Sequence, residues 1–438
     1  MSDHEKKPRS PEEVQNDFLE MIRNKLGSAE VITLPLGLGA EEPEETEEVP
    51  EKGPHLADSL RFELTPAKVK AHLDRFVIGQ DEAKRTLAVA VCDHYNHVRR
   101  ANAAAAKGET LDYVKQNVIL LGPTGVGKTY LIRTIAQLVG VPFVKADITK
   151  FSETGYVGGD VDDLVRELVR TADGSVELAE YGIIFLDEID KIASASNLMG
   201  RDVSGRGVQT GLLKLLEETE VPTRSPNDVG GQLQDFMQLR KKKAAKRTIN
   251  TRHILFVVSG AFTGLSEIIE KRLSERNIGF AASTATARTG SVGDVLAQVN
   301  TRDFVDYGFE PEFIGRLPIR VALNDLSEED LFRILQTSEG SILKQHRDNF
   351  LGYGIEAHFE SDAMRAVAAR AILEKTGARG LMTVLESSLR TFKFHLPESP
   401  VRQLVIDRSV IEDPAGALEK VLASPADAEA AFARAQVR

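Results

Sequence analysis

The stretch Asn117-Val-Ile-Leu-Leu-Gly122-Pro-Thr-Gly-Val-Gly-Lys128-Thr129 decides the fold that this sequence predicts. An apolar run leads into a glycine-rich turn, and an amphipathic stretch over residues 128–139 follows. This is the strand–loop–helix context of a Walker A loop, whose backbone N–H groups curl around phosphate oxygens at the start of a helix. Lys128 is expected to reach the β- and γ-phosphates of ATP, and the Thr129 hydroxyl is expected to ligate Mg²⁺. The predicted nucleotide-binding residues of this loop are Gly122, Pro123, Thr124, Gly125, Val126, Gly127, Lys128, Thr129 and Tyr130.

A second motif, Ile183-Ile-Phe-Leu-Asp187-Glu188, has the form of a Walker B segment. A strand that buries itself delivers both carboxylates to its C-terminal end, where open α/β sheets bind ligands. Asp187 is expected to hold Mg²⁺ through water, and Glu188 to orient and polarise the attacking water. The next two charged residues, Asp190 and Lys191, are interpreted as structural.

Short apolar runs and amphipathic stretches alternate from Thr65 onward. Continuously apolar runs rich in Val, Ile and Phe indicate a parallel sheet covered by helices on both faces. After residue 324 the pattern becomes mainly helical. We therefore predict an α/β fold, with a large P-loop domain over 61–324, a smaller, mainly helical α+β domain over 325–424 and a tail over 425–438. The strand-like runs are 117–121, 142–146, 182–186, 253–258, 355–359 and 403–406, and the later candidate helices are 329–341, 361–373 and 380–395.

Residues 1–60 are expected to be a disordered, acidic extension that contains one short helix. The run EEPEETEEVPEKGP at 41–54 holds seven glutamates and three prolines, which is typical of a solvated linker. The amphipathic stretch 11–26 before it has the spacing of a helix. It is either part of a spacer or a docking element whose partner the sequence does not identify.

Composition excludes several classes of protein. Of the 438 residues, 42% are hydrophobic and 28% are charged, which is typical of a globular chain rather than a membrane-embedded or wholly disordered one. The formal net charge of -11 weighs against general affinity for nucleic acid. No secretion signal or membrane span is expected, so we predict a cytoplasmic protein.

The sequence predicts neither a zinc site nor a peptidase site. The single cysteine, Cys92, is interpreted as a small buried hydrophobe, and it rules out an internal disulfide or a zinc module built on several thiolates. His94 and His97 lie three residues apart with no third ligand nearby in sequence, so a structural role is preferred over zinc binding. No Ser-His-Asp or Cys-His arrangement is evident, and we do not expect the chain to cut peptide bonds itself.

From the P-loop onward the chain resembles the ClpX unfoldase family of the AAA+ superfamily, with HslU as the nearest relative family. The resemblance covers roughly residues 66–415 and rests on several motifs. Phe76-Val-Ile-Gly-Gln80 is similar to the family's box beside the adenine, which implies that Val77 and Ile78 pack against the base. It also implies an AAA+ large domain, a small C-terminal domain, and ATP with Mg²⁺ as cofactors.

Two loops resemble the family's pore loops. Gly155-Tyr156-Val157-Gly158 carries an aromatic residue between glycines, which suits a mobile loop that grips a polypeptide without reading its sequence. The alternative is a tyrosine that packs locally in a turn. Arg201 begins a segment similar to the second pore loop, and it is otherwise a solvated loop arginine.

Two arginines resemble the family's nucleotide sensors. Phe313-Ile-Gly-Arg316-Leu-Pro is similar to the arginine-finger box, and an arginine supplied by a neighbouring subunit stabilises charge on the transferring phosphoryl group. Gly377-Ala-Arg379-Gly resembles the sensor-2 motif, which implies that Arg379 touches the γ-phosphate in cis. The alternative for either arginine is a surface ion pair. The resemblance also implies a polar sensor-1 residue at the end of the strand-like run 254–260, where Ser259 is the candidate.

The segment Ile278-Gly279-Phe280 resembles the loop with which ClpX docks on the ClpP peptidase, although a local hydrophobic contact is the alternative. The chain departs from the family in two places. The usual N-terminal zinc domain, built on four cysteines, has no counterpart, so adaptor and substrate choice cannot be carried over. Residues 240–247 read RKKKAAKR, which is either a positive collar at the substrate entrance or a solvated loop.

The resemblance implies a homo-hexameric ATPase that threads unfolded or tagged proteins through its pore and delivers them to a ClpP-like peptidase. The catalytic set would be Lys128, Asp187, Glu188 and Arg316. Two alternatives are a remodelling chaperone that works without a peptidase and a DNA-directed AAA+ motor. The Gly-Tyr-Val-Gly loop and the acidic balance weigh against the DNA-directed motor, and no membrane or nucleic-acid partner is expected.

Overall fold

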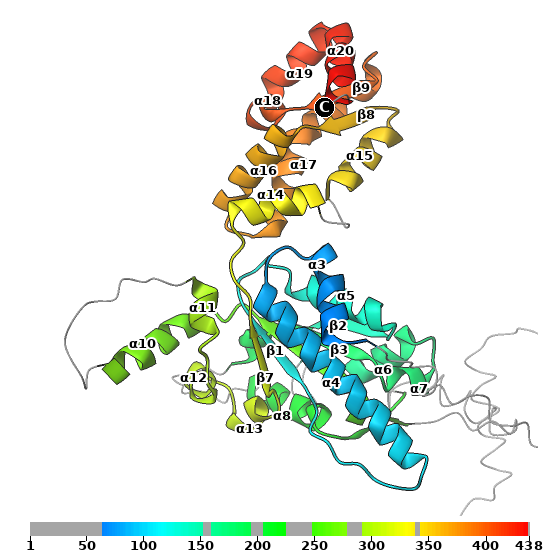
Figure 1. Ribbon diagram of the computed structural model, residues 1–438, viewed down its shortest axis with the longest axis vertical. Helices are drawn as coiled ribbons and strands as arrows, with labels where there is room; N and C mark the ends of the chain where they lie inside the picture. Colours follow the sequence, from blue (N-terminus) through cyan, green and yellow to red (C-terminus); the bar gives the residue numbers. More distant parts are fainter. Residues whose placement is uncertain are drawn as a thin grey trace, which may run out of the picture. The chain divides into compact units, whose positions relative to one another are not determined.

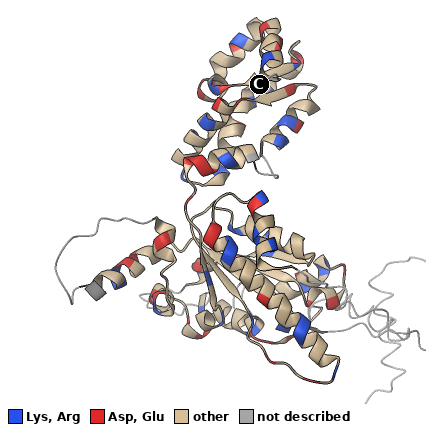
Figure 2. Ribbon diagram, viewed as in Figure 1, with Lys and Arg blue, Asp and Glu red and all other residues tan. Residues whose placement is uncertain are grey.

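The computed structural model describes residues 64–151, 159–193, 205–224, 248–277, 291–337 and 342–436. All of them belong to one compact unit that spans Pro54–Arg438. No helix among these residues is long and apolar enough to cross a membrane. Figure 2 shows both acidic and basic residues spread over the described helices.

A five-stranded parallel sheet forms the centre of the fold (Figure 1). The spatial order is β2-β3-β6-β1-β7, so the P-loop strand β1 lies between β6 and the edge strand β7. In this order β6 separates β1 from β3, and the carboxyl ends of all three parallel strands lie at the same edge. The strands are β1 Val118–Leu121, β2 Phe143–Asp147, β3 Ile183–Asp187, β6 Leu255–Gly260 and β7 Ile319–Ala322.

Alternating side chains of these strands enter two separate cores. Val118 and Leu120 of β1 face one core, which also holds Leu87 of α4 and Leu131 of α5. Ile119 and Leu121 face the other core, as expected for a strand whose successive side chains point to opposite faces. The helices are α3 Pro66–Phe76, α4 Asp81–Ala105, α5 Lys128–Val139, α6 Asp162–Thr171, α7 Val176–Ala179, α8 Gly205–Leu216, α10 Leu265–Asn277, α11 Val292–Leu296, α12 Thr301–Tyr307 and α13 Pro311–Gly315. The helix-covered parallel sheet predicted from the sequence is confirmed.

The C-terminal region is mainly helical, as predicted, and contains a two-stranded parallel sheet of β8 and β9. The boundary predicted near residue 324 falls in the connection between β7 and α14. Within the tail predicted over 425–438, residues Pro425–Gln436 form a helix. The elements are α14 Glu328–Thr337, α15 Ile342–Gly352, β8 Glu356–Phe359, α16 Ser361–Leu373, α17 Ala378–His395, β9 Gln403–Ile406, α18 Arg408–Glu412, α19 Pro414–Ala423 and α20 Pro425–Gln436.

Smaller elements complete the described part of the chain. A short antiparallel pair, β4 Glu220–Pro222 and β5 Thr248–Asn250, follows α8 and had no counterpart in the sequence analysis. Four 3-10 turns are η1 Ile148–Lys150, η2 Ile189–Ile192, η3 Thr251–His253 and η4 Leu396–Glu398.

Candidate active site

The glycine-rich loop connects the carboxyl end of β1 to the start of α5. Gly127 precedes the helix with φ +98°, a left-handed conformation that an L side chain rarely adopts. Gly125 has φ +80°, and a Cβ built there would lie 2.0 Å from the carbonyl oxygen of Thr376. The backbone N–H of Ala378 donates to the carbonyl of Gly125 at 3.0 Å. These contacts bring the start of α17, and with it Arg379, against the P-loop.

Lys128 is the first residue of α5 and is half-buried. Its ammonium donates to the carbonyls of Gly122 at 2.5 Å and Pro123 at 2.7 Å. Burial lowers the pKa of Lys128 to about 8, while the negative charges of Asp187 and Asp190 act in the opposite direction. The side chain is therefore held close to the loop and next to the place where phosphate oxygens would receive backbone N–H groups.

Several polar groups contact the carboxylate of Asp187 at the carboxyl end of β3. One carboxylate oxygen accepts from the Thr129 hydroxyl at 3.5 Å and lies 3.2 Å from the Lys145 ammonium. The other oxygen accepts from the Ser259 hydroxyl at 3.1 Å and from the backbone N–H of Glu188, also at 3.1 Å. Hydroxyl and carboxylate oxygens are the ligands that Mg²⁺ prefers, so Thr129 and Asp187 fit a metal held together with ATP.

Glu188 has an unusual backbone. It adopts φ +60° and ψ +30°, a conformation that few residues other than glycine take, and its side chain is exposed. Strained backbone of this kind is often found at active sites. Here it places a carboxylate directly after the metal-binding candidate Asp187.

These groups surround a cleft of about 590 Å³, which is within the usual size range of ligand sites. Residues from the P-loop, from β3 and from α17 line it together. Among them are Lys128, Thr129, Tyr130, Asp187, Glu188 and Arg379. Asp190, which was interpreted as structural, is buried and also lines the cleft.

The predicted adenine-contacting residues, Val77 and Ile78, are buried directly after α3 and are not among the described lining residues of that cleft. The next residues fix their position. The side-chain amide of Gln80 donates to the carbonyl of Asn324 at 2.7 Å and accepts from its N–H at 2.9 Å. This box is therefore tied to the connection between β7 and α14.

Arg316 lies away from the cleft, at the amino end of β1. Its backbone carbonyl accepts from the Asn117 amide at 3.1 Å, and its guanidinium pairs with Glu217 at 2.5 Å. A strand rises about 3.3 Å per residue, so Asn117 and Gly122 are separated by roughly 16 Å. The structure thus groups Lys128, Thr129, Asp187, Glu188 and Arg379 and leaves Arg316 outside that group.

Several predicted residues lie outside the described parts of the chain: Tyr156, Val157, Arg201, Ile278, Gly279, Phe280 and the basic run 240–247. Backbone pairing holds the described residues that flank two of these segments. Phe151 bridges Gly159 on either side of 152–158, and β4 pairs with β5 on either side of 225–247.

The histidines and the cysteine have structural surroundings. Cys92 is buried, as predicted, and burial raises the pKa of its thiol to about 11. His94 is fully buried, one ring nitrogen lies 3.0 Å from the His253 carbonyl, and burial lowers its pKa to about 3. Across the described ranges, no three His, Cys, Asp or Glu residues are grouped so as to hold a metal ion.

Sequence reasoning missed Lys145 and gave Ser259 no partner. Lys145 stands on β2 two residues before its end, where nothing in the sequence marks it as a neighbour of Asp187. Ser259 could be found only as the polar residue that closes an apolar run. The pairing of β3 with β2 on one side and with β6 on the other explains both omissions, because strands that are distant in the sequence bring these side chains together.

Comparison with known proteins agrees with this geometry. The AAA domain (Cdc48 subfamily) family model matches residues 114–320. A Treponema denticola protein named "ATP-dependent Clp protease ATP-binding subunit ClpX" is 42% identical over 350 residues, covering 79% of this chain and 81% of the relative. The chain belongs to the ClpX family. Proteins of the same name from Borrelia duttonii and Azotobacter vinelandii are 40% and 37% identical, over 79% and 84% of this chain and 78% and 82% of their own lengths.

Membership in the ClpX family establishes two points about the site. The chain is an AAA+ ATPase, and it binds nucleotide. The P-loop cleft, with its lysine, paired acids and Arg379, is the part of the described structure that has the chemistry for both.

Proposed function

We propose that this ClpX-family chain assembles into a ring of six copies, in the cytoplasm, and hydrolyses ATP at sites between neighbouring copies. The work of hydrolysis unfolds tagged or unstructured proteins and threads them to a ClpP-like peptidase. The relatives' name, a protease ATP-binding subunit, supports a motor that serves a separate peptidase.

The observation that carries this proposal is the position of Arg316. The other predicted catalytic side chains line the cleft at the carboxyl end of β1, whereas Arg316 is bonded to Asn117 at the amino end. An arginine that is half-exposed and this far from its own P-loop is suited to reach the site of a neighbouring copy. Such an arginine, supplied in trans, stabilises charge on the transferring phosphoryl group and couples hydrolysis to assembly.

Within one site the chain's residues have separate tasks. Lys128 and the loop N–H groups hold the phosphates, Thr129 and Asp187 hold Mg²⁺, and Arg379 contacts the γ-phosphate from α17. Glu188 orients the attacking water. The chemistry that Mg²⁺ supplies with ATP is neutralisation of charge that develops between the β- and γ-phosphates.

Substrate grip and peptidase docking rest on the resemblance to the family. In this proposal Tyr156, Val157 and Arg201 line the pore, and Ile278, Gly279 and Phe280 enter apolar clefts on the peptidase. An aromatic residue on a loop can hold a polypeptide through steric contact without reading its sequence. The bridge between Phe151 and Gly159 fixes the described residues on either side of the segment that contains Tyr156 and Val157.

The test is degradation of a tagged, folded reporter with ATP, in the presence and absence of ClpP. We expect loss of the reporter only when chain, ATP and ClpP are all present. Phe280→Ala should abolish degradation and spare ATP hydrolysis, whereas Phe394→Ala, the same change at a residue that is 77% exposed, should leave both intact. ClpP binding that is indifferent to Phe280→Ala would favour a remodelling chaperone that works without a peptidase.

Tyr156→Ala tests the grip separately from docking. It should stop reporter degradation while ClpP binding persists. Tyr353→Ala removes a tyrosine that is 52% exposed in the C-terminal region and serves as the matched control. Equal degradation by both variants would remove Tyr156 from the pore.

A further inference from the structure

The two polar residues that lead into β1 form hydrogen bonds with the carboxyl end of helix α8. Lys115 and Asn117 immediately precede the strand that ends in the P-loop. Together they donate to three consecutive backbone carbonyls, those of Leu215, Leu216 and Glu217. A helix end leaves its last carbonyls without partners in the helix, and these side chains take over that role for α8.

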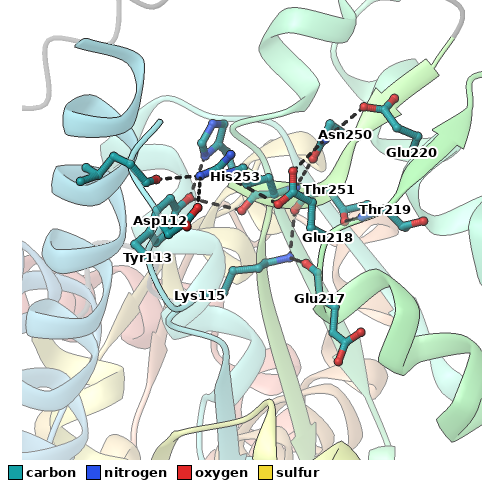
Figure 3. Close-up of polar contacts among 12 residues, drawn as sticks. Asp112, Tyr113, Lys115, Glu217, Glu218, Thr219, Glu220, Asn250, Thr251 and His253 are labelled. Atoms are coloured by element: carbon teal, nitrogen blue, oxygen red, sulfur yellow. Dashed lines mark hydrogen bonds and ion pairs between the residues drawn. The ribbon is translucent and has the colours of Figure 1, made fainter. Parts of the chain in front are cut away.

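The ammonium of Lys115 donates three hydrogen bonds to backbone carbonyls. It donates to the carbonyls of Leu215 at 3.2 Å, Glu217 at 3.1 Å and Thr251 at 2.9 Å, and Figure 3 shows it directed at the last two. It also lies 4.7 Å from the centre of the Phe256 ring. Burial lowers the pKa of Lys115 to about 7, while the negative charge of Glu218 and the carboxyl end of the helix favour the charged form.

Asn117 is buried and its amide is saturated. The amide nitrogen donates to the carbonyls of Leu216 at 3.2 Å and Arg316 at 3.1 Å, and the amide oxygen accepts from the N–H of Phe256. Removing this side chain would take a hydrogen-bond partner from each of these three backbone groups, two of which are buried. These three backbone groups belong to three different segments of the chain, so a smaller polar side chain at position 117 could not bond all of them.

The segment after α8 is held from its other side as well. Thr219 and Thr251 exchange hydrogen bonds, and the Asn250 amide donates to Glu218 and Glu220 (Figure 3). Glu217 is therefore at the start of a fixed segment, and its carboxylate pairs with the guanidinium of Arg316. Both members of this ion pair have their backbone carbonyls bound by the residues before β1.

We propose that Lys115 and Asn117 are positioning residues for Arg316, holding its backbone and its partner Glu217 in fixed relation to β1. This inference rests on the proposed function, in which Arg316 acts on the site of a neighbouring copy. A long, half-exposed arginine reaches only as far as its backbone anchor allows, and a displacement of about 1 Å at a catalytic group costs up to a hundredfold in rate. The same two residues cap α8, so a movement of that helix would be transmitted to Arg316.

The test uses rings that mix wild-type chains with chains that cannot hydrolyse ATP. A Glu188→Gln chain contributes its Arg316 to a wild-type neighbour and no turnover of its own. Adding Lys115→Met to the Glu188→Gln chain removes the ammonium and keeps the apolar stem. Because the site of that chain is already inactive, any further loss of turnover arises in the wild-type neighbour.

With the inactive chain in about fivefold excess, about five in six wild-type sites receive Arg316 from it. Under these conditions we expect the mixture with Lys115→Met/Glu188→Gln to hydrolyse ATP at least about threefold more slowly than the mixture with Glu188→Gln alone. Lys115→Arg/Glu188→Gln should recover most of that loss, because the charge and the donors remain. The matched control, Lys107→Met/Glu188→Gln, makes the same change at an exposed lysine and should have no effect. Asn117→Ser/Glu188→Gln provides an independent variant should Lys115→Met fail to fold, and should slow the mixture in the same way.

An Arg316→Ala/Glu188→Gln chain distinguishes a failure of the proposed function from a failure of the positioning role of Lys115 and Asn117. If it does not slow its wild-type neighbours, Arg316 does not act in trans and the proposed function itself fails. If it slows them while both the Lys115 and Asn117 variants match the control, Arg316 keeps its role and the positioning proposal is wrong. Equal sedimentation of all mixtures verifies that the comparison is made between assembled rings.

Discussion

Nucleotide binding should be coupled to proton uptake by Lys128. Burial lowers the pKa of this lysine to about 8, below its ordinary value of 10.5. Phosphate oxygens placed against the ammonium favour the charged form, so the pKa rises again when nucleotide binds. The bound state therefore holds more protons than the free state at pH values near and above 8.

The size of the effect follows from the pKa. At pH 8 about half of the free chains carry a neutral Lys128, so binding should take up about 0.5 proton per nucleotide, whereas at pH 6.5 the uptake is only about 0.03. By linkage, nucleotide affinity should fall roughly tenfold per pH unit once the pH is well above 8. Below pH 7 it should be insensitive to this group.

Calorimetric titration in two buffers with different ionisation enthalpies measures the proton number directly. The Glu188→Gln chain is the appropriate background, because it is expected to bind ATP without turning it over. Lys128→Arg is the control, because a guanidinium does not titrate in this range, so residual binding should show no uptake at pH 8. No proton uptake at pH 8 in the lysine chain, or equal uptake in the arginine chain, would refute the reasoning.

Three further predictions concern the same cleft. Glu188→Gln should retain ATP binding and lower turnover by at least about 100-fold, measured as phosphate release, and undiminished hydrolysis would remove Glu188 from the water-positioning role. Ser259→Ala removes the hydroxyl that donates to Asp187 at 3.1 Å; we expect a lower kcat with ATP affinity changed less than about threefold, and a change confined to affinity would contradict this. Gly125→Ala adds a Cβ 2.0 Å from the Thr376 carbonyl at a position with φ +80°; it should destabilise the fold by about 1–3 kcal/mol in denaturant titrations and weaken nucleotide binding, and an unchanged midpoint would show that the loop does not pack as described.

Sequence patterns predicted the central elements well where local signals and burial agree. Helix α5 was predicted at its observed bounds, Lys128–Val139, because a glycine with positive φ lies just outside each end. Strand β9, Gln403–Ile406, was likewise predicted at its bounds. Each element has enough apolar residues of one period to identify it without knowledge of its neighbours.

The sequence did not predict the strands β7, β4 and β5, because none of them has a recognisable local pattern. Strand β7, Ile319–Ala322, lies at the sheet edge, is only partly buried and includes Arg320, so its sequence has no continuous apolar run. The strands β4 and β5 have three residues each and acquire their identity only by pairing with one another.

The contacts around Arg316 also could not be predicted from the sequence. Asn117 and Arg316 are 199 residues apart along the chain, and their hydrogen bond depends on the sheet that brings β1 beside β7. The motif identified Arg316 as a candidate, but its distance from the P-loop of its own chain is a property of the fold. This distance is what makes a site shared between copies the preferred interpretation.

Complementation between two inactive chains tests that shared site most directly. Arg316→Ala keeps Glu188, and Glu188→Gln keeps Arg316, so each chain alone should form assemblies with little ATP hydrolysis. When the two are mixed in equal amounts before assembly, about a quarter of the sites join an intact Glu188 to an intact Arg316 from the next copy. We predict that ATP hydrolysis recovers toward that fraction of the wild-type rate. A mixture that is as inactive as its two components would contradict catalysis at an interface between copies.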